Sequence, residues 1–187
     1  LHDALPICYE MSPEERRILM ALPDLPDEDT EREMYYMTRN CLGEQGYERY
    51  EISNYARPGF ECRHNVGYWT GTGYLGLGLG ASSYLEGCRF HNTSDFQSYV
   101  SAHFDDKAEF NQTLRQDFEQ LSVKSKMEEF MFLGLRLTRG VSAEGFITRF
   151  GQSIRNVYGG VIDKLEREGL LEHKNGYYRL TERGLDL

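Results

Sequence analysis

Hydrophobic residues recur at two different spacings along the chain, and the first of these is the spacing of helices. The sequence predicts a short helix over residues 13–22 and a firmer one over residues 28–42, which Asp27 should cap at its N-terminus. The apolar positions of the second helix recur every three or four residues: Met34, Met37, Cys41 and Leu42. These positions should therefore face a core, and Cys41 is interpreted as a core residue.

The spacing then changes to the alternation that is typical of strands. Residues 47–55 are predicted as a strand because Tyr50 and Ile52 alternate with polar neighbours. Residues 71–87 read GTGYLGLGLGASSYLEG, so a strand here would carry leucines on one face and only glycines on the other. A bare glycine face indicates close approach either by another backbone or by a ligand, and both explanations stay open.

The last third of the chain predicts three helices followed by a hairpin, after a polar connector at residues 105–120. The first helix should cover residues 124–137. The second should follow Ser142 as its N-cap and end near Gly151, and the third should lie within residues 153–171 and stop at Gly169. Asn175 and Gly176 form the strongest short-range signal for a hairpin turn. This order of elements is the layout of a winged helix, a domain whose commonest association is DNA binding.

Composition and charge narrow the classes of function. The chain has 187 residues, of which 40% are hydrophobic, so a packed core is expected. A net charge of −9 argues against general nucleic-acid binding, which depends on basic residues that neutralise phosphates. A winged-helix DNA-binding regulator stays as an alternative, although Asp163, Glu166 and Glu168 would place acids of the third helix against phosphates. No apolar run is long enough to predict a membrane span.

Four cysteines, Cys8, Cys41, Cys62 and Cys88, are too widely spaced to predict a self-contained zinc site, an iron–sulfur site or a compact disulfide framework. Reduced thiols and a cytoplasmic location are therefore expected. The sequence begins without a signal-peptide pattern and both of its ends look cut, so a fragment of a longer protein is predicted. Gly76-x-Gly78-x-x-Ala81 matches a dinucleotide fingerprint only formally, because no helix pattern opens directly after it.

The segment ECRHNVGYW, residues 61–69, gathers the most chemistry into the shortest stretch. If it is extended, Cys62 and His64 share a face, but two ligands do not complete a zinc site. One imidazole can hold a haem iron, because the porphyrin supplies four nitrogens, and Asn65 could orient that imidazole. Tyr68 and Trp69 offer flat faces to a macrocycle. The alternative is a turn pinned by Asn65, with both aromatic rings buried beneath it.

The residues from Tyr50 to Asn92 resemble the HemW family of radical-SAM haem chaperones, which is closely related to oxygen-independent coproporphyrinogen III oxidases. The resemblance rests on the Tyr-Glu-Ile-Ser-Asn stretch at residues 50–54, on a His-Asn-x-x-Tyr-Trp motif and on the glycine row. The matching residues of the motif are His64, Asn65, Tyr68 and Trp69; those of the glycine row and beyond are Gly76, Gly78, Gly80, Arg89 and Asn92. The glycine row, Arg89 and Asn92 are expected to lie near the cofactor.

The resemblance implies an α/β fold in which the closing elements of a partial radical-SAM barrel precede a winged-helix-like domain. The predicted parts are residues 8–104 for the barrel and haem motif, 105–123 for a connector and 124–187 for the C-terminal domain, with residues 1–7 unmatched. In the whole protein a [4Fe–4S] cluster and S-adenosylmethionine are implied. The C-x-x-x-C-x-x-C ligands of that cluster are absent from this sequence, so the chain alone is not expected to be an enzyme.

The function implied is haem binding through His64 and delivery of the haem to haem-requiring apoproteins. The expected partners are haem, those apoproteins and the missing N-terminal half of the barrel, without nucleic acid. The enzyme alternative is oxygen-independent coproporphyrinogen III oxidase, which the His-Asn-x-x-Tyr-Trp motif disfavours. One departure matters: Ser82 stands where the family commonly has histidine, which leaves His64 and His91 as candidate ligands.

Overall fold

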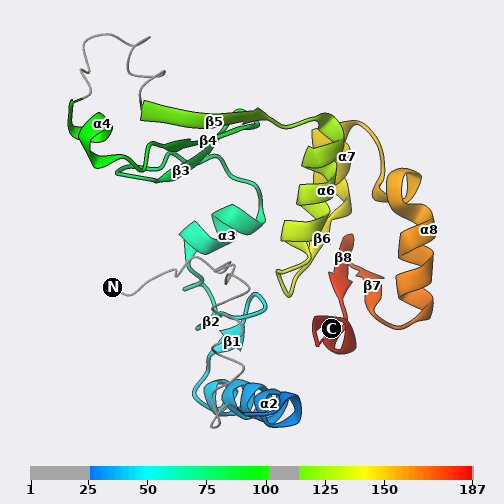
Figure 1. Cartoon of the computed structure of the whole chain (residues 1–187). Helices are drawn as coiled ribbons and strands as arrows, with labels where there is room; N and C mark the ends of the chain where they lie inside the picture. The colour runs from blue at the N-terminus through cyan, green and yellow to red at the C-terminus, as the bar shows by residue number, and fades with distance from the viewer. Residues whose placement is uncertain (1–25, 102–113, 187) are drawn as a thin grey trace. The chain divides into compact units, whose positions relative to one another are not determined.

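The computed structural model describes residues 26–101 and 114–186 (Figure 1). The helix predicted over residues 13–22 and the start of the predicted connector lie outside these ranges. The chain divides into two compact units, one ending at Val66 and the other beginning at Gly67. Each unit is described by itself.

In the first unit, helix α2 spans Glu28–Glu44, and its capping follows the prediction. The side chain of Asp27 accepts a hydrogen bond of 2.8 Å from the backbone N–H of Thr30. The predicted burial of its apolar positions is wrong, because none of the helix residues is buried and Met37 is 64% exposed. Cys41 is also exposed rather than a core residue. A helix buries an apolar stripe only where another element covers it, and the described part of this unit offers α2 chiefly a short hairpin.

The prediction of one strand over residues 47–55 is wrong, because the chain turns back within these residues. Strand β1 (Glu48–Arg49) pairs antiparallel with β2 (Tyr55–Ala56). The carboxylate of Glu51, which is fully buried, accepts hydrogen bonds from the backbone N–H of Ser53, at 2.8 Å, and from the Asn54 side chain. These bonds fold residues 50–54 into a turn that so short a run of alternating residues could not reveal.

The second unit begins in helix α3 and continues into an antiparallel sheet. Its strands are β3 (Ser82–Leu85), β4 (Cys88–Asn92) and β5 (Arg115–Gln120), in the order β3-β4-β5, with helix α4 (Phe96–Ser101) between β4 and β5. Residues 115–120 of the predicted connector form strand β5, which pairs with β4. For these residues the prediction of a connector is wrong. The turn between β3 and β4 has positive φ at Glu86 (52°) and Gly87 (77°), as a tight two-residue hairpin requires.

The C-terminal part confirms the prediction of three helices followed by a hairpin. The helices are α6 (Val123–Gly134), α7 (Ala143–Phe150) and α8 (Ile154–Arg167), and the hairpin is β7 (Leu171–Lys174) with β8 (Tyr177–Leu180). A short strand β6 (Val141–Ser142) joins this hairpin in the order β6-β8-β7, and α9 (Glu182–Leu185) follows. Asn175 and Gly176 make the predicted turn with φ of 52° and 80°.

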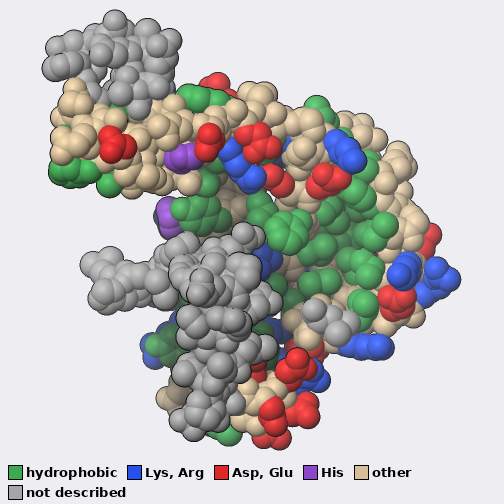
Figure 2. Space-filling model, in the orientation of Figure 1, with side chains coloured by type: hydrophobic (Ala, Val, Ile, Leu, Met, Phe, Trp, Pro, Cys, Tyr) green, Lys and Arg blue, Asp and Glu red, His purple; other side chains and the backbone are tan. Residues whose placement is uncertain are grey.

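A single apolar core holds these elements together. Its buried members are Met127, Met131, Val141, Phe146, Ile154, Ile162, Leu171 and Tyr178. Phe146 is completely buried, and its ring centroid lies 4.7 Å from that of Phe150 and 5.5 Å from that of Phe130. Val157 and Val161 are exposed, because the buried face of α8 is the one that carries Ile154 and Ile162. Apolar side chains are visible among charged ones over α6–α8 in Figure 2.

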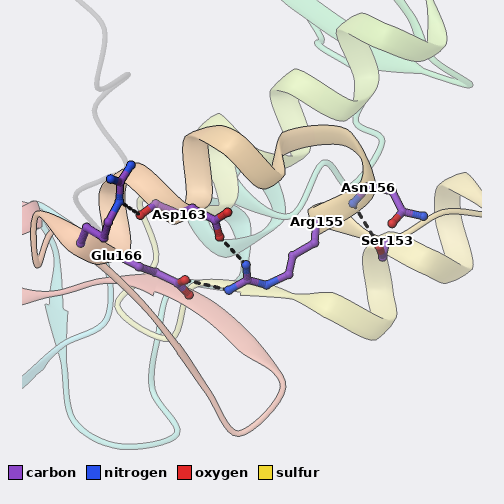
Figure 3. A network of polar contacts seen from close by, with 6 residues as sticks. Ser153, Arg155, Asn156, Asp163 and Glu166 are labelled. Carbon is purple, nitrogen blue, oxygen red and sulfur yellow. Dashed lines mark hydrogen bonds and ion pairs between the residues drawn. The ribbon is translucent and has the colours of Figure 1, made fainter.

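The exposed face of α8 is crossed by an ion-pair network (Figure 3). The guanidinium of Arg155 donates to Asp163 at 2.6 Å and to Glu166 at 2.7 Å. The hydrogen bonds with Glu166 and then with Asp163 raise the pKa of Arg155 above its ordinary value. Two of the acids that the sequence analysis placed on this helix therefore pair within the helix itself.

Candidate functional site

The predicted haem motif lies on helix α3, which spans Arg63–Trp69. The extended conformation expected for residues 62–64 is therefore wrong: the backbone N–H of Val66 already donates to the Cys62 carbonyl at 3.0 Å, as in a helical turn. Residues two apart on a helix point about 200° apart, so Cys62 and His64 do not share a face. The two side chains cannot act as a pair of ligands in this conformation.

His64 is exposed at the start of α3. Among the described residues, no group of three or more His, Cys, Asp or Glu side chains could hold a metal ion by itself. Haem iron needs only one axial ligand from the protein, because the porphyrin occupies four positions. An accessible imidazole on a helix fits that requirement, and the other ring nitrogen is the one whose hydrogen bond would fix the tautomer.

Asn65, in contrast, is buried and faces the hairpin of the first unit. Burial raises the pKa of Tyr50, against hydrogen bonds that its hydroxyl makes with the Asn65 side chain and the Cys62 backbone. The carboxamide thus ties the start of α3 to the β1–β2 hairpin. The segment is a helix and not the pinned turn given above as the alternative. An orienting role of Asn65 towards His64 stays a prediction.

The two aromatic residues of the motif lie in the second unit and pack there. Trp69 is 7% exposed, and the guanidinium carbon of Arg136 lies 4.4 Å from the centroid of its ring. The half-buried Tyr68 packs edge-on against Tyr74, with centroids 4.8 Å apart. Trp69 therefore anchors α3 in this conformation, and direct contact between its ring and a porphyrin would require α3 to move.

The glycine row is not the predicted strand. Within residues 71–81 only one isolated bridge, between Tyr74 and Tyr84, joins the segment to β3. The alternating leucines face solvent, with Leu77 85% exposed. A Cβ atom on Gly76 would collide with the carbonyl oxygen of Ser82, so glycine is required there for close approach of another backbone.

The structure nevertheless brings several predicted cofactor-proximal residues together. The side-chain N–H groups of Asn92 donate to the carbonyls of Gly78, at 2.7 Å, and Gly76, at 3.3 Å. The hydroxyl of the buried Ser83 accepts from the Gly76 N–H at 3.0 Å. Asn92 and the glycine row thus form one hydrogen-bonded unit, and proximity to a cofactor stays a prediction.

Three further predicted positions have local partners. Gly80 has φ of 67°, and its N–H donates to the carbonyl of Thr93 at 3.0 Å. Arg89 pairs with Glu129 at 2.9 Å, so its charge is satisfied within the protein. Ser82, where the family commonly has histidine, lies directly across the strand pair from His91.

A cleft that the sequence analysis missed lies within the second unit, where Lys126 of α6 and Arg149 of α7 line one space with the β3–β4 turn. The two residues are 23 positions apart on different helices, and neither belongs to a motif. Only tertiary packing reveals that they converge.

The chain is similar in sequence to a family of known proteins. Residues 121–187 match the family model described as the HemN C-terminal domain. The chain is similar to the protein named Heme chaperone HemW of Lactococcus lactis subsp. lactis, with 39% identity over 163 residues, and to that of Bacillus subtilis, with 35% identity over 160 residues. These matches cover 87% and 86% of this chain. The resemblance to the HemW family is confirmed.

The HemW-like chain spans about 41% of the length of each of these two relatives. Its fold is similar to that of coproporphyrinogen III oxidase (HemN) from Escherichia coli, described as a radical SAM enzyme, with a TM-score of 0.60 and 17% identity. That likeness covers 86% of this chain and 39% of the other and shows the fold alone. The predicted mixed α/β fold, matching the C-terminal region of such proteins, is confirmed.

Two other predictions concern membrane spans and domain boundaries. In the described ranges, no helix combines the length and the apolar character that crossing a bilayer requires. The domain boundaries expected at residues 104 and 124 stay predictions.

Proposed function

We propose that this chain is part of a haem chaperone, which binds haem and passes it to haem-requiring apoproteins in the cytoplasm. The support is that its relatives at 39% and 35% identity are named Heme chaperone HemW, and that the histidine of its His-Asn-x-x-Tyr-Trp motif is exposed. Because the chain spans about 41% of those relatives, the activity of a whole protein belongs to the proposal.

In this proposal His64 supplies the axial nitrogen to the haem iron, and Tyr68 lies on the same helix one turn further along. The i and i+4 positions of a helix share a face, so the two side chains can contact one ligand. Asn65 and Trp69 act from behind this face: they hold α3 through Tyr50 and Arg136, respectively. A [4Fe–4S] cluster and S-adenosylmethionine would belong to the parent protein, because this sequence lacks their cysteine triplet.

The second candidate is an oxygen-independent coproporphyrinogen III oxidase, which the fold likeness to the Escherichia coli enzyme favours. Identity with that enzyme is only 17%, whereas the relatives at 35–39% carry the chaperone name. The chaperone is therefore the better supported of the two.

The test is a haem titration of the 187-residue chain, followed by the Soret band, beside His64→Ala. We expect the unmodified chain to shift and sharpen the Soret band, and we expect the variant to lose most of this shift. Loss of the iron–nitrogen bond should weaken haem binding by about tenfold or more, which corresponds to about 1.4 kcal/mol.

The matched control is His173→Ala, which removes another exposed imidazole, on strand β7. His173 stacks on Tyr178 with centroids 4.2 Å apart, so the thermal midpoint of each variant should be measured alongside the titration. A Soret shift that survives in His64→Ala and disappears in His173→Ala would contradict the assignment of His64.

A further inference from the structure

The cleft between the β3–β4 hairpin and helices α6 and α7 has the volume of a small-molecule site. Its volume is about 560 Å³, within the range of about 300–1,000 Å³ that is common for ligand pockets. It is lined by Gly71, Gly73, Tyr84, Glu86, Gly87, Val123, Lys126, Arg149 and Phe150. All of these residues belong to the second unit.

Two cations line this cleft without a carboxylate partner among the described residues. Arg149 packs its guanidinium over the rings of Phe150, at 5.7 Å, and Phe130, at 6.0 Å. Lys126, half-buried on α6, lies against Gly87 of the β3–β4 turn. Several other basic residues of the unit do pair with acids, as Arg155 does with Asp163 and Glu166, and Arg179 with Glu172. Lys126 and Arg149 therefore keep their donors for a ligand.

Two glycines make room for these cations. The Nη1 atom of Arg149 lies 3.2 Å from the position that a Cβ atom on Gly71 would occupy. A Cβ atom on Gly87 would collide with the ammonium group of Lys126. A side chain at position 87 would push the Lys126 ammonium group aside, and one at position 71 would crowd Arg149, so both cations lie close to the backbone of the cleft.

The remaining wall of the cleft is apolar. It consists of Tyr84, Phe150 and Val123, and the last of these is 63% exposed. An apolar ligand body would cover this exposed surface, while its charged groups met Lys126 and Arg149. One acid, Glu86, also lines the cleft and should repel a ligand anion.

We propose that this cleft binds the carboxylate groups of an amphipathic, mainly apolar ligand. Arg149 can hold a carboxylate through two parallel hydrogen bonds, and Lys126 provides a second point charge. The carboxylate class follows from the cleft itself. The choice of a tetrapyrrole with two carboxylate side chains rests on the proposed function.

The experiment titrates the 187-residue chain with metal-free protoporphyrin IX, followed by porphyrin fluorescence. This probe keeps both carboxylates but has no iron, so its binding does not depend on an axial histidine. We expect Lys126→Gln/Arg149→Gln to weaken binding by about tenfold. The weakening should shrink at high salt, because both cations are partly solvent-exposed.

A matched control carries the same loss of charge elsewhere, as Lys124→Gln/Arg167→Gln. Lys124 and Arg167 are exposed on α6 and α8 and do not line the cleft. Glu86→Gln should have the opposite effect on affinity. It removes a negative charge that repels the carboxylates of the porphyrin, so binding should tighten by about two- to threefold. The dimethyl ester of the porphyrin, which lacks the anions, should bind as weakly to the unmodified chain as the free acid binds to the double variant.

Equal affinity of the unmodified chain and of Lys126→Gln/Arg149→Gln would overturn the inference, as would equal binding of the ester and the free acid. Displacement of the porphyrin by an equal concentration of oleate would support the carboxylate class but overturn the choice of a tetrapyrrole. The two proposals can fail separately: His64→Ala in the haem titration tests the iron ligand, and the paired cations in the porphyrin titration test the cleft.

Discussion

Asn92 illustrates how a single side chain accounts for an unusual stretch of sequence. Its carboxamide donates to the carbonyls of Gly76 and Gly78, so it replaces the strand pairing that the glycine row lacks. An intramolecular hydrogen bond of this kind contributes about 0.5–1.5 kcal/mol net. At the residue scale, the glycine row is thus shaped by one polar contact and by the tight approach of Gly76 to Ser82.

Replacing Asn92 tests this interpretation. Asn92→Ala should lower the free energy of unfolding by about 1–3 kcal/mol, because two hydrogen bonds of about 0.5–1.5 kcal/mol each are lost. Urea denaturation measures the effect. Asn92→Asp is the matched variant, since it keeps the shape but cannot donate at neutral pH. If Asn92→Asp were as stable as the unmodified chain, the side chain would act by packing and not by hydrogen bonding.

At the element scale, helix α2 depends on its ends more than on its faces. None of its residues is buried, so packing contributes little within the described part of the unit. Its N-terminus is instead capped by Asp27. Its first turn carries Glu28, Asp29 and Glu31, whose negative charges interact favourably with the positive end of the helix dipole. The stability of α2 should therefore depend on the cap that Asp27 provides.

The side-chain and backbone hydrogen bonds of Thr30 lower the pKa of Asp27 below its ordinary 3.8. A depressed pKa means that the cap stabilises the folded state above about pH 3.8 and that this stabilisation is lost as the pH falls through the lower folded value. Asp27→Asn caps equally well but does not titrate. We expect the protection factor of the Thr30 amide, which is its intrinsic exchange rate at each pH divided by the observed rate, to fall less on acidification in Asp27→Asn than in the unmodified chain.

Glu28, Asp29 and Glu31 are present in both proteins, so the comparison isolates the cap. Identical pH profiles for the Thr30 amide in the two proteins would show that the Asp27 cap does not set the acid sensitivity of α2.

At the scale of the whole molecule, Trp69 reports how the second unit is assembled. It is the chain's single tryptophan, and it is buried against Arg136, which lies just beyond α6. The backbone around it is also close to α6, since a Cβ atom on Gly134 would lie 3.8 Å from the Trp69 carbonyl oxygen. One fluorophore therefore senses the contact between α3 and the C-terminal helices.

Arg136→Ala should expose the indole ring and lower the free energy of unfolding by about 0.5–2 kcal/mol through loss of the cation–π contact. Acrylamide, a neutral quencher, should then quench the tryptophan emission more strongly than in the unmodified chain. Arg139→Ala removes an exposed arginine three residues away and should change neither measurement. Equal quenching in all three proteins would mean that Arg136 does not shield Trp69.

Local features of this fold were predictable because they depend on neighbouring residues. The caps at Asp27 and Ser142 and the turn at Asn175-Gly176 each form through bonds or dihedral preferences that span only a few positions. The motif from His64 to Trp69 could be found for the same reason, since it is a contiguous pattern of residue types. Its conformation could not be, because seven helical residues give no clear period.

By itself, the sequence determined the caps, the turns, the order of the C-terminal helices and hairpin, and the resemblance to the HemW family. The tertiary structure alone decided that Cys41 is exposed, that Trp69 is buried while His64 is not, and that Lys126 meets Arg149 in a cleft. The physical reason is that hydrogen bonds of caps and turns are made within a few residues of the chain. Burial and the convergence of charges, in contrast, depend on partners far away in the sequence.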